Sequence, residues 1–278
     1  YRMFFDDILR AAPHTLTPAE EKIYARMAVL GEAGGTLQSV FRSADLPFPE
    51  VTFSTGDKVR LDASAYSKWR ASPNKADRDL AFKAFWTAYN QFTRTFATTL
   101  NAHVESHVFA KDVRGFGSSL EAALFDYNIP TTVYTRLIED VHANLPTLHR
   151  YLQLRQKIMG MKQLGYEDLY APIVQQVDLQ YTPEQGMQMT LDSFAPLGTE
   201  YVETLRKGYA DRWVDFMPNT GKSPGAYSNT VYGVHPYQLL NFNGAWDDVS
   251  TLAHESGHSM HSFMSTAKQP YATSSYST

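Results

Sequence analysis

The sequence contains one H-E-x-x-H segment, made of His254, Glu255 and His258. Two histidines four positions apart on a helix lie one above the other on the same face, so both imidazoles can bind one zinc ion. Zinc held by three protein ligands keeps a fourth position for water and lowers the pKa of that water to about 7, and a nearby carboxylate can take the proton. The segment therefore predicts a helix carrying a metal-assisted hydrolytic site, with His254 and His258 as ligands and Glu255 as general base.

The residues around this segment are compatible with a helix. Asp248 or Ser250 can cap its start, and Gly257 is the weak position, because glycine costs about 1 kcal/mol relative to alanine inside a helix. Such a glycine is tolerated where a backbone or a ligand must come close. The alternative is an amphipathic helix whose histidines only cap or pack. The apolar side of the helix consists of Val249, Leu252, Ala253 and Met260.

Composition excludes several classes of function. The 278 residues are 43% hydrophobic, with a net charge of −4, so the chain has the core of a globular protein and no basic surface that would follow nucleic acid or an anionic membrane. No apolar run reaches the roughly 18 residues of a membrane span, and the start does not resemble a signal peptide. Without cysteine, a metal site must use His, Asp or Glu. Because position 1 is not methionine, we expect the chain to begin inside a longer protein.

Helix signals dominate up to about residue 207. Capping boxes at Thr17 to Glu20, Ser118 to Glu121 and Thr182 to Gln185 each predict a helix start. Residues 50–61 alternate around Gly56 and predict a small β-hairpin. A long helical pattern from Ser72 carries an aromatic and aliphatic stripe that we expect to be core. Its members are Phe82, Phe85, Trp86, Tyr89, Phe92, Phe96, Leu100 and Val104.

The pattern changes after residue 207. Residues 225–228 and 235–242 predict short strands before the H-E-x-x-H helix. An edge strand at that place can pair with an extended peptide through main-chain hydrogen bonds. We therefore expect a mainly helical region over 1–207 and a second region, 208–278, that holds the strands and the metal-binding helix.

A second histidine pair, His103 and His107, has the same spacing. Its intervening acid, Glu105, lies two residues after the first histidine, about 200° around the helix, so it cannot serve a metal on the imidazole face. We interpret this pair as solvated or structural.

Three clustered segments carry a resemblance to a known family: residues 221–228 (GKSPGAYS), 235–242 (HPYQLLNF) and 254–262 (HESGHSMHS). Together they resemble the oligoendopeptidase F branch of the M3 (thimet-type) metallopeptidases. The likeness extends upstream through 110–128 and 198–218. It implies a mainly α fold, a helical zincin with a small β-sheet beside the H-E-x-x-H helix. It also implies zinc as cofactor, short unfolded oligopeptides as substrates and a cytoplasmic location.

The resemblance also assigns roles to residues of this chain. His254 and His258 would hold the zinc ion, and Glu255 would be the general base and proton shuttle. Gly225, Ala226 and Tyr227 would lie along the substrate. His235 and Tyr237 match positions near the cleft, where a structural role and a substrate-binding role are equally open.

The chain departs from the family after its motif. Relatives use a glutamate on a following helix as third ligand, whereas no Asp or Glu follows Glu255 here. His261 shares the histidine face but lies about 10 Å along the axis from His254, too far to bind the same ion, so we expect it to orient a ligand or pack.

We therefore expect a piece of a longer enzyme that by itself binds zinc weakly and does not cleave peptides. The alternatives are a non-catalytic peptide-binding module, a structural helical protein with an accidental motif, and another zincin clan. The metzincin continuation after His258 is absent, which disfavours that last alternative.

Overall fold

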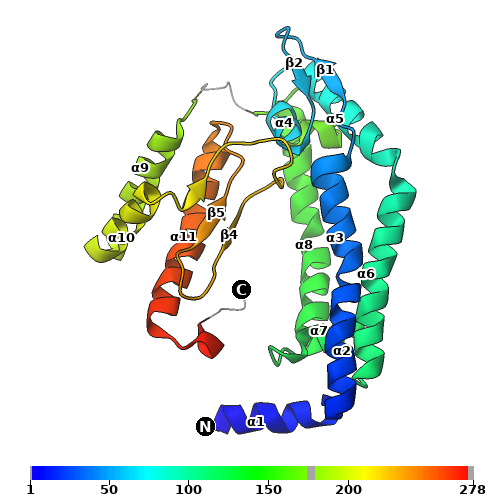
Figure 1. Ribbon diagram of the computed structural model, residues 1–278. Coiled ribbons are helices and arrows are strands. Elements are labelled where there is room, and N and C mark those ends of the chain that lie inside the picture. Colours follow the sequence, from blue (N-terminus) through cyan, green and yellow to red (C-terminus); the bar gives the residue numbers. More distant parts are fainter. Residues whose placement is uncertain (1, 174–178, 275–278) are drawn as a thin grey trace. The chain divides into compact units, whose positions relative to one another are not determined.

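The structure is a computed structural model and describes residues 2–173 and 179–274. Helices account for most of these residues and the strands are short (Figure 1), as the mainly α prediction requires. The chain forms two compact units. Unit 1 is Tyr1–Leu46 with Thr87–Leu164, and unit 2 is Pro47–Trp86 with Gly165–Thr278. These bounds do not coincide with the expected division at 207, which was based on local composition; that division stays a prediction.

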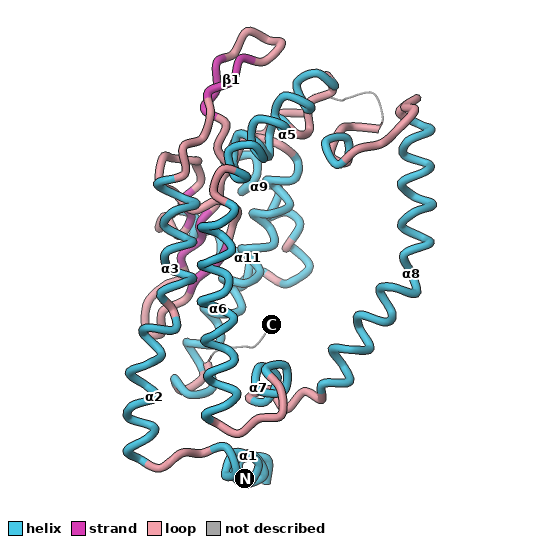
Figure 2. Tube along the Cα trace, turned by 90° about the vertical axis from the view of Figure 1, so that its right-hand side faces the viewer, coloured by secondary structure: helices cyan, strands magenta, loops and turns pink. Residues whose placement is uncertain are grey.

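Unit 1 is built from helices, several of them long (Figure 2). Within it, α3 packs against α6, α2 contacts both, and α7 joins α6 to the start of α8. Gly34 permits the close approach of α3 to α6, since a Cβ there would lie 2.9 Å from the Thr99 carbonyl oxygen. The elements are α1 (Arg2–Ala11), α2 (Pro18–Gly31), α3 (Ala33–Val40), α6 (Thr93–Val113), α7 (Ser119–Phe125) and α8 (Thr131–Ile158).

The predicted helix starts are confirmed where capping acts locally. Thr17 caps α2, and the Glu20 carboxylate accepts a hydrogen bond from the Thr17 N–H at 2.9 Å. Ser118 accepts from the Glu121 N–H at 3.0 Å at the start of α7. Helix α8 continues through Pro146.

The expected aromatic core is wrong in part. The pattern from Ser72 does not form one helix, because α5 (Lys75–Asn90) ends and α6 begins after a break of two residues. Along the stripe only Phe85 is buried, whereas Trp86 and Leu100 are 43% and 63% exposed. Helical periodicity shows which residues share a face, but it does not show whether another element covers that face.

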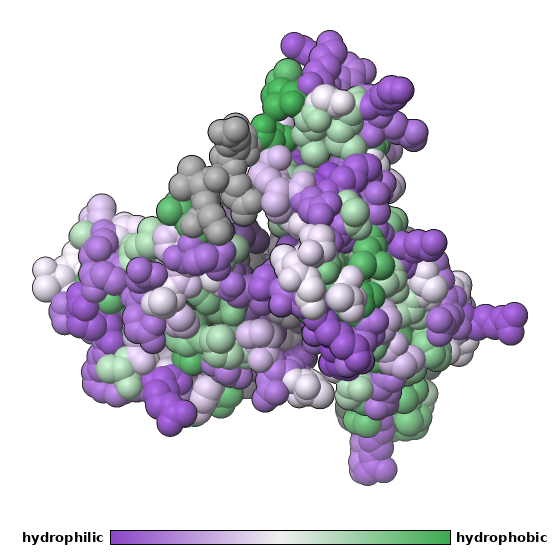
Figure 3. Space-filling model, turned by 90° about the horizontal axis from the view of Figure 1, so that it is seen from above, coloured by the Kyte–Doolittle hydropathy of each residue, from purple (hydrophilic) through white to green (hydrophobic). Residues whose placement is uncertain are grey.

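Exposed apolar side chains are numerous in unit 1. Helix α1 has no buried residue, and α8 buries only Arg155. The face drawn in Figure 3 likewise shows hydrophobic side chains among hydrophilic ones. No helix in the described part of the chain is both long and apolar enough to cross a membrane.

Unit 2 begins with the predicted hairpin. Strands β1 (Glu50–Thr52) and β2 (Lys58–Arg60) pair antiparallel, with Val51 opposite Val59. The hairpin leads into α4 (Ala63–Trp69) and the first part of α5. The ring of Phe53, which follows β1, stacks on the ring of Trp69 at the end of α4, with the ring centroids 3.7 Å apart.

The rest of unit 2 surrounds the long helix α11 (Trp246–Lys268), which confirms the predicted H-E-x-x-H helix. Helices α9 (Pro183–Ser193) and α10 (Thr199–Ala210) and a three-stranded sheet pack against it (Figure 1). The sheet order is β3-β5-β4: β5 (Tyr237–Leu239) pairs parallel with β3 (Val214–Asp215) and antiparallel with β4 (Tyr227–Asn229). The core between these elements contains Leu191, Leu205, Trp213 and Met260.

Candidate active site on helix α11

The start of α11 is held by a carboxylate from inside the helix. Asp248 accepts hydrogen bonds from the N–H groups of Asn243 at 3.0 Å and Ala245 at 2.8 Å. Burial raises the pKa of Asp248 above its usual value. The helix begins before the expected cap residues, at Trp246, with Ala245 as its N-cap residue. Asp248 therefore caps the start from the third helical position, and Ser250 lies inside the helix.

His254, Glu255 and His258 meet in one turn of α11. The two imidazoles converge, with Nε2 of His254 3.1 Å from Nε2 of His258. His254 is exposed, whereas Glu255 is only 8% exposed. His258 is half-buried, so the pair is partly open to solvent. Glu255, the residue after His254, lies on the buried side of the helix.

This arrangement fits two of the ligands of a zinc ion. Tetrahedral zinc with Zn–N distances of about 2.05 Å holds two nitrogens about 3.3 Å apart, close to the separation of the two Nε2 atoms. Among residues 2–173 and 179–274, no group of three or more His, Asp or Glu side chains could hold a metal ion. The described residues thus offer a pair of converging donors.

Below the histidines, α11 buries a polar stripe against the sheet. Ser256 and Ser259 are both 0% exposed. The Gln238 Nε2 of β5 donates to Ser259 Oγ at 2.9 Å and to Ser256 Oγ at 3.4 Å. Ser259 Oγ also lies 2.7 Å from Ser228 Oγ on β4, and Ser256 Oγ lies 2.7 Å from the Tyr209 hydroxyl on α10. These five side chains, named here the serine network, connect α11 to both β4 and β5.

The predicted substrate residues lie along β4 and the turn before it. Gly225 has φ +87°, a conformation that favours glycine. Its carbonyl oxygen accepts from Asn241 Nδ2 at 2.8 Å, and the same amide donates to the Ser223 carbonyl at 3.0 Å. Asn241 therefore fixes the turn from which Ala226 and Tyr227 extend.

His235 and Tyr237 are held beside the sheet. The His235 ring is parallel to the Trp213 ring, with the ring centroids 5.9 Å apart, and tilted relative to the Tyr237 ring, with the centroids 4.4 Å apart. Its Nδ1 lies 2.7 Å from the Pro236 carbonyl oxygen. These contacts give His235 a packing role that does not require substrate.

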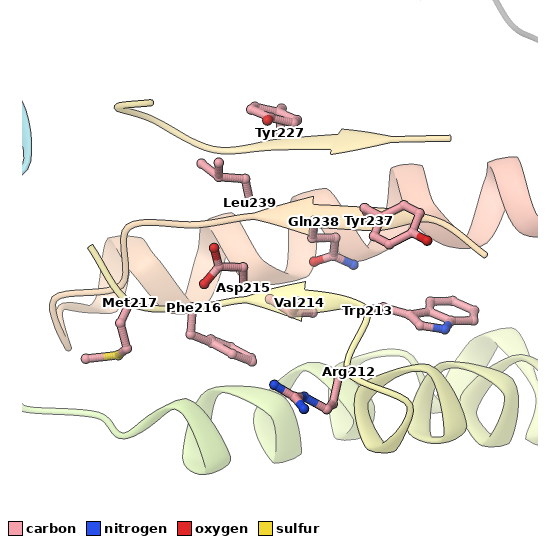
Figure 4. A pocket seen from close by; sticks show the side chains of 10 residues that line it. All are labelled: Arg212, Trp213, Val214, Asp215, Phe216, Met217, Tyr227, Tyr237, Gln238 and Leu239. Carbon is pink, nitrogen blue, oxygen red and sulfur yellow. The ribbon is translucent and has the colours of Figure 1, made fainter. Parts of the chain in front are cut away.

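A pocket of about 420 Å³ opens on the sheet (Figure 4), and Tyr227 and Tyr237 both line it. Its one carboxylate, Asp215, is paired with Lys222 Nζ at 3.1 Å, and Lys222 also donates to the Met217 carbonyl at 2.7 Å. The charge of Asp215 is therefore largely balanced. The lining residues come from β3 and its flanks, β4 and β5: Arg212, Trp213, Val214, Asp215, Phe216, Met217, Tyr227, Tyr237, Gln238 and Leu239.

The rival pair lies elsewhere. His103 and His107 are exposed on α6 in unit 1, with ring centroids 4.5 Å apart. His261 is also exposed, on the histidine side of α11. A role for His261 in orienting a ligand stays a prediction.

Comparison with known proteins decides the family. The sequence profile described as "Peptidase family M3" matches residues 69–278, and the profile "Oligopeptidase F" matches residues 1–48. The chain belongs to peptidase family M3. Its resemblance to the oligoendopeptidase F branch is thereby confirmed.

Similar proteins support the same assignment. The M3 chain is 36% identical to oligopeptidase PepF of Bacillus subtilis over its whole length and covers 41% of that protein. It is 35% identical to group B oligopeptidase PepB of Streptococcus agalactiae, covering 100% of this chain and 46% of that one. The chain thus spans less than half the length of these relatives.

Solved structures confirm the fold. The oligoendopeptidase-F structure from Enterococcus faecium matches 77% of this M3 chain and 40% of its own, with 32% identity and a TM-score of 0.60. The fold is therefore the mainly helical zincin of this family.

Sequence reasoning missed the serine network of this M3 chain. One signal was present: Ser256 and Ser259 are polar residues three apart on the side of α11 that also carries Leu252 and Met260. Their partners Gln238 and Tyr209 lie in other elements, and the sequence around those two residues does not indicate that they contact α11.

Proposed function

We propose that this chain provides the zinc-binding helix of an endopeptidase that hydrolyses short unfolded oligopeptides. The observation that carries the proposal is the convergence of the His254 and His258 Nε2 atoms, 3.1 Å apart, beside the buried Glu255. Membership of peptidase family M3 supports it, as do relatives that are named oligopeptidases.

In this proposal His254 and His258 hold zinc through Nε2. Zinc, when bound, supplies a lowered pKa for its water and polarises the scissile carbonyl. Glu255 takes the proton from the attacking water and passes it to the leaving amine; such general acid–base help contributes about 10²- to 10⁴-fold. Strand β4 pairs with the extended peptide at the edge of the sheet, so that Gly225, Ala226 and Tyr227 run along the substrate.

A zinc titration with matched histidine variants tests the metal site. His254→Ala should abolish zinc binding measured by calorimetry, because one donor of the converging pair is lost. His103→Ala is the control, since it removes an exposed histidine from a pair with the same spacing on α6. Loss of zinc binding in His103→Ala but not in His254→Ala would place the metal on α6 instead of α11 and overturn the proposal.

For the 278-residue chain alone, we predict weak zinc binding and no turnover. Two histidines and water hold zinc poorly compared with three protein ligands. A quenched-peptide assay with excess zinc measures this. Robust cleavage by the chain would contradict the prediction.

A peptide-binding module without catalysis is the second candidate, and the edge position of β4 in the sheet favours it. Binding of peptide without product would distinguish it from the enzyme. Both candidates concern peptide partners in the cytoplasm and neither involves nucleic acid, for which a chain of net charge −4 provides no basic surface.

A further inference from the structure

Ser228 lies at the free edge of the sheet. The Gln238 and Leu240 N–H groups of the β5 segment donate toward β3, at 2.8 and 2.9 Å. Because N–H and C=O directions alternate along a strand, Tyr237 and Leu239 point theirs toward β4. Their β4 partners are Asn229 and Tyr227. The residue between those two, Ser228, therefore points its backbone N–H and C=O away from β5.

The side chain of the same residue is tied to the metal-binding helix. Ser228 Oγ lies 2.7 Å from Ser259 Oγ, and Ser259 follows His258 directly. Since Gln238 Nε2 already donates to Ser259, the Ser259 hydroxyl hydrogen is available for Ser228. One residue thus presents main-chain groups to the edge and holds the helix that carries the histidines and Glu255.

The serine network is more polar than stability alone requires. Gln238 is 2% exposed, and its Oε1 is buried without a hydrogen-bond partner in the described part of the chain. A network with an unsatisfied member is less stable than apolar packing of the same volume. Polar groups do, however, set register, because a displaced strand would leave buried hydroxyls unpaired.

We propose that Ser228, through Ser259 and Gln238, is a positioning residue that sets the register of a bound peptide against Glu255 and the zinc-binding histidines. This inference rests on the proposed function and extends it to residues outside the motif. The peptide pairs with the Ser228 main chain. The contact between the Ser228 and Ser259 hydroxyls keeps that part of β4 at a fixed position relative to α11.

Peptide binding by single and double variants tests the inference. The probe is the tightest binder among a small set of fluorescein-labelled nonapeptides, followed by anisotropy with zinc present. Ser228→Ala and Ser259→Ala should each weaken peptide binding about fivefold, because without this hydrogen bond of about 1 kcal/mol the peptide itself must order β4 on binding. The double variant should weaken it no further, because both changes remove the same contact. Ser228→Thr, which keeps the hydroxyl, should bind like the parent.

A control and a zinc titration separate positioning from general stability. Thr266→Ala removes a hydroxyl from the same helix. Among the described residues, that hydroxyl donates to the Ser262 and Phe263 carbonyls of α11, so peptide affinity should stay unchanged. Zinc affinity should stay the same in all variants. Equal peptide affinity in parent, Ser228→Ala and Ser259→Ala would overturn the inference while leaving the proposed function intact, whereas a parent that binds neither zinc nor peptide would overturn both.

Hydrogen exchange on the peptide-free chain gives an independent measurement. Ser259→Ala should raise amide exchange in residues 225–231 and leave α11 protected, because only the attachment of β4 is lost. Unchanged exchange in that segment would show that β4 is held by other contacts and would also overturn the inference.

Discussion

Glu255 lies where two faces of α11 meet. It is one residue, or about 100° around the helix, from His254. On one side are the imidazoles, and on the other is the stripe of Ser256 and Ser259 buried against the sheet. A carboxylate that is shielded from bulk water and follows His254 directly suits the proton shuttle that we propose.

Glu255→Gln should keep zinc and lose catalysis. The amide cannot take a proton from water, so the rate should fall by about 10²- to 10⁴-fold, while the two histidines are unchanged. The rate is measured in a form of the protein with the length of the relatives, and zinc affinity in the 278-residue chain. Substantial residual turnover would reject Glu255 as the base.

Tyr209→Phe should change the alkaline stability. Burial raises the pKa of Tyr209 to about 12, so the stability it contributes is complete below the unfolded value of 10 and is lost as the pH rises from 10 to 12. At pH 7 the variant should be less stable by about 1 kcal/mol, because the bond to Ser256 is lost.

Above pH 10 the parent should lose up to about 3 kcal/mol that the variant does not, so the order of stabilities should reverse. Urea unfolding at pH 7 and at pH 11 measures the difference, with the exposed Tyr271→Phe as control. If the difference in free energy of unfolding between parent and variant were the same at pH 7 and pH 11, a raised pKa for Tyr209 would be rejected.

At the scale of elements, the packing of α11 and α10 explains two glycines differently. Among the described residues, nothing lies within 4 Å of a Cβ built on Gly257. A Cβ on Gly208 of α10 would lie 2.5 Å from the Trp213 ring. Gly208 is thus required by packing in this chain, whereas Gly257 is not.

Gly257→Ala should stabilise the chain by about 1 kcal/mol, because alanine restricts the unfolded backbone and favours helix. The matched variant Gly208→Ala should destabilise it by about 1–3 kcal/mol, because the rigid indole must move. Thermal unfolding of both variants measures these effects. Destabilisation by Gly257→Ala would mean that the space beside it is occupied in the folded chain.

At the scale of the whole molecule, the H-E-x-x-H helix and all four tryptophans belong to unit 2. Tryptophan fluorescence therefore reports on this unit alone, whereas far-UV circular dichroism reports on the helices of both. A ligand that binds only folded unit 2 stabilises that unit by mass action.

Zinc should therefore separate the two signals. At a free concentration of 100 times Kd, it should stabilise unit 2 by about 2.7 kcal/mol and raise the fluorescence midpoint. The part of the circular dichroism change that comes from unfolding of unit 1 should keep its original midpoint temperature. In His254→Ala, zinc should shift neither signal; a shift that persists there would place the metal away from α11.

How much could be predicted from sequence depends on the range of the interaction. The starts of α2 and α7, the hairpin at 50–61 and the helix of His254 were predicted correctly, because capping, turn chemistry and histidine spacing act within a few residues. The exposed stripe on α6 was not, since burial depends on what packs against a face.

The sequence by itself therefore determined the H-E-x-x-H helix and the common face of its two histidines, because these groups lie within one helical turn. The roles of these residues in zinc binding and proton transfer stay predictions. Only the tertiary structure decided which contacts hold this helix against α10 and the sheet. Tyr209 and Ser256 are 47 residues apart, and Ser228 and Ser259 are 31 apart. Such contacts exist only after helix and sheet have packed, and burial then makes each unpaired hydroxyl costly enough to select one register.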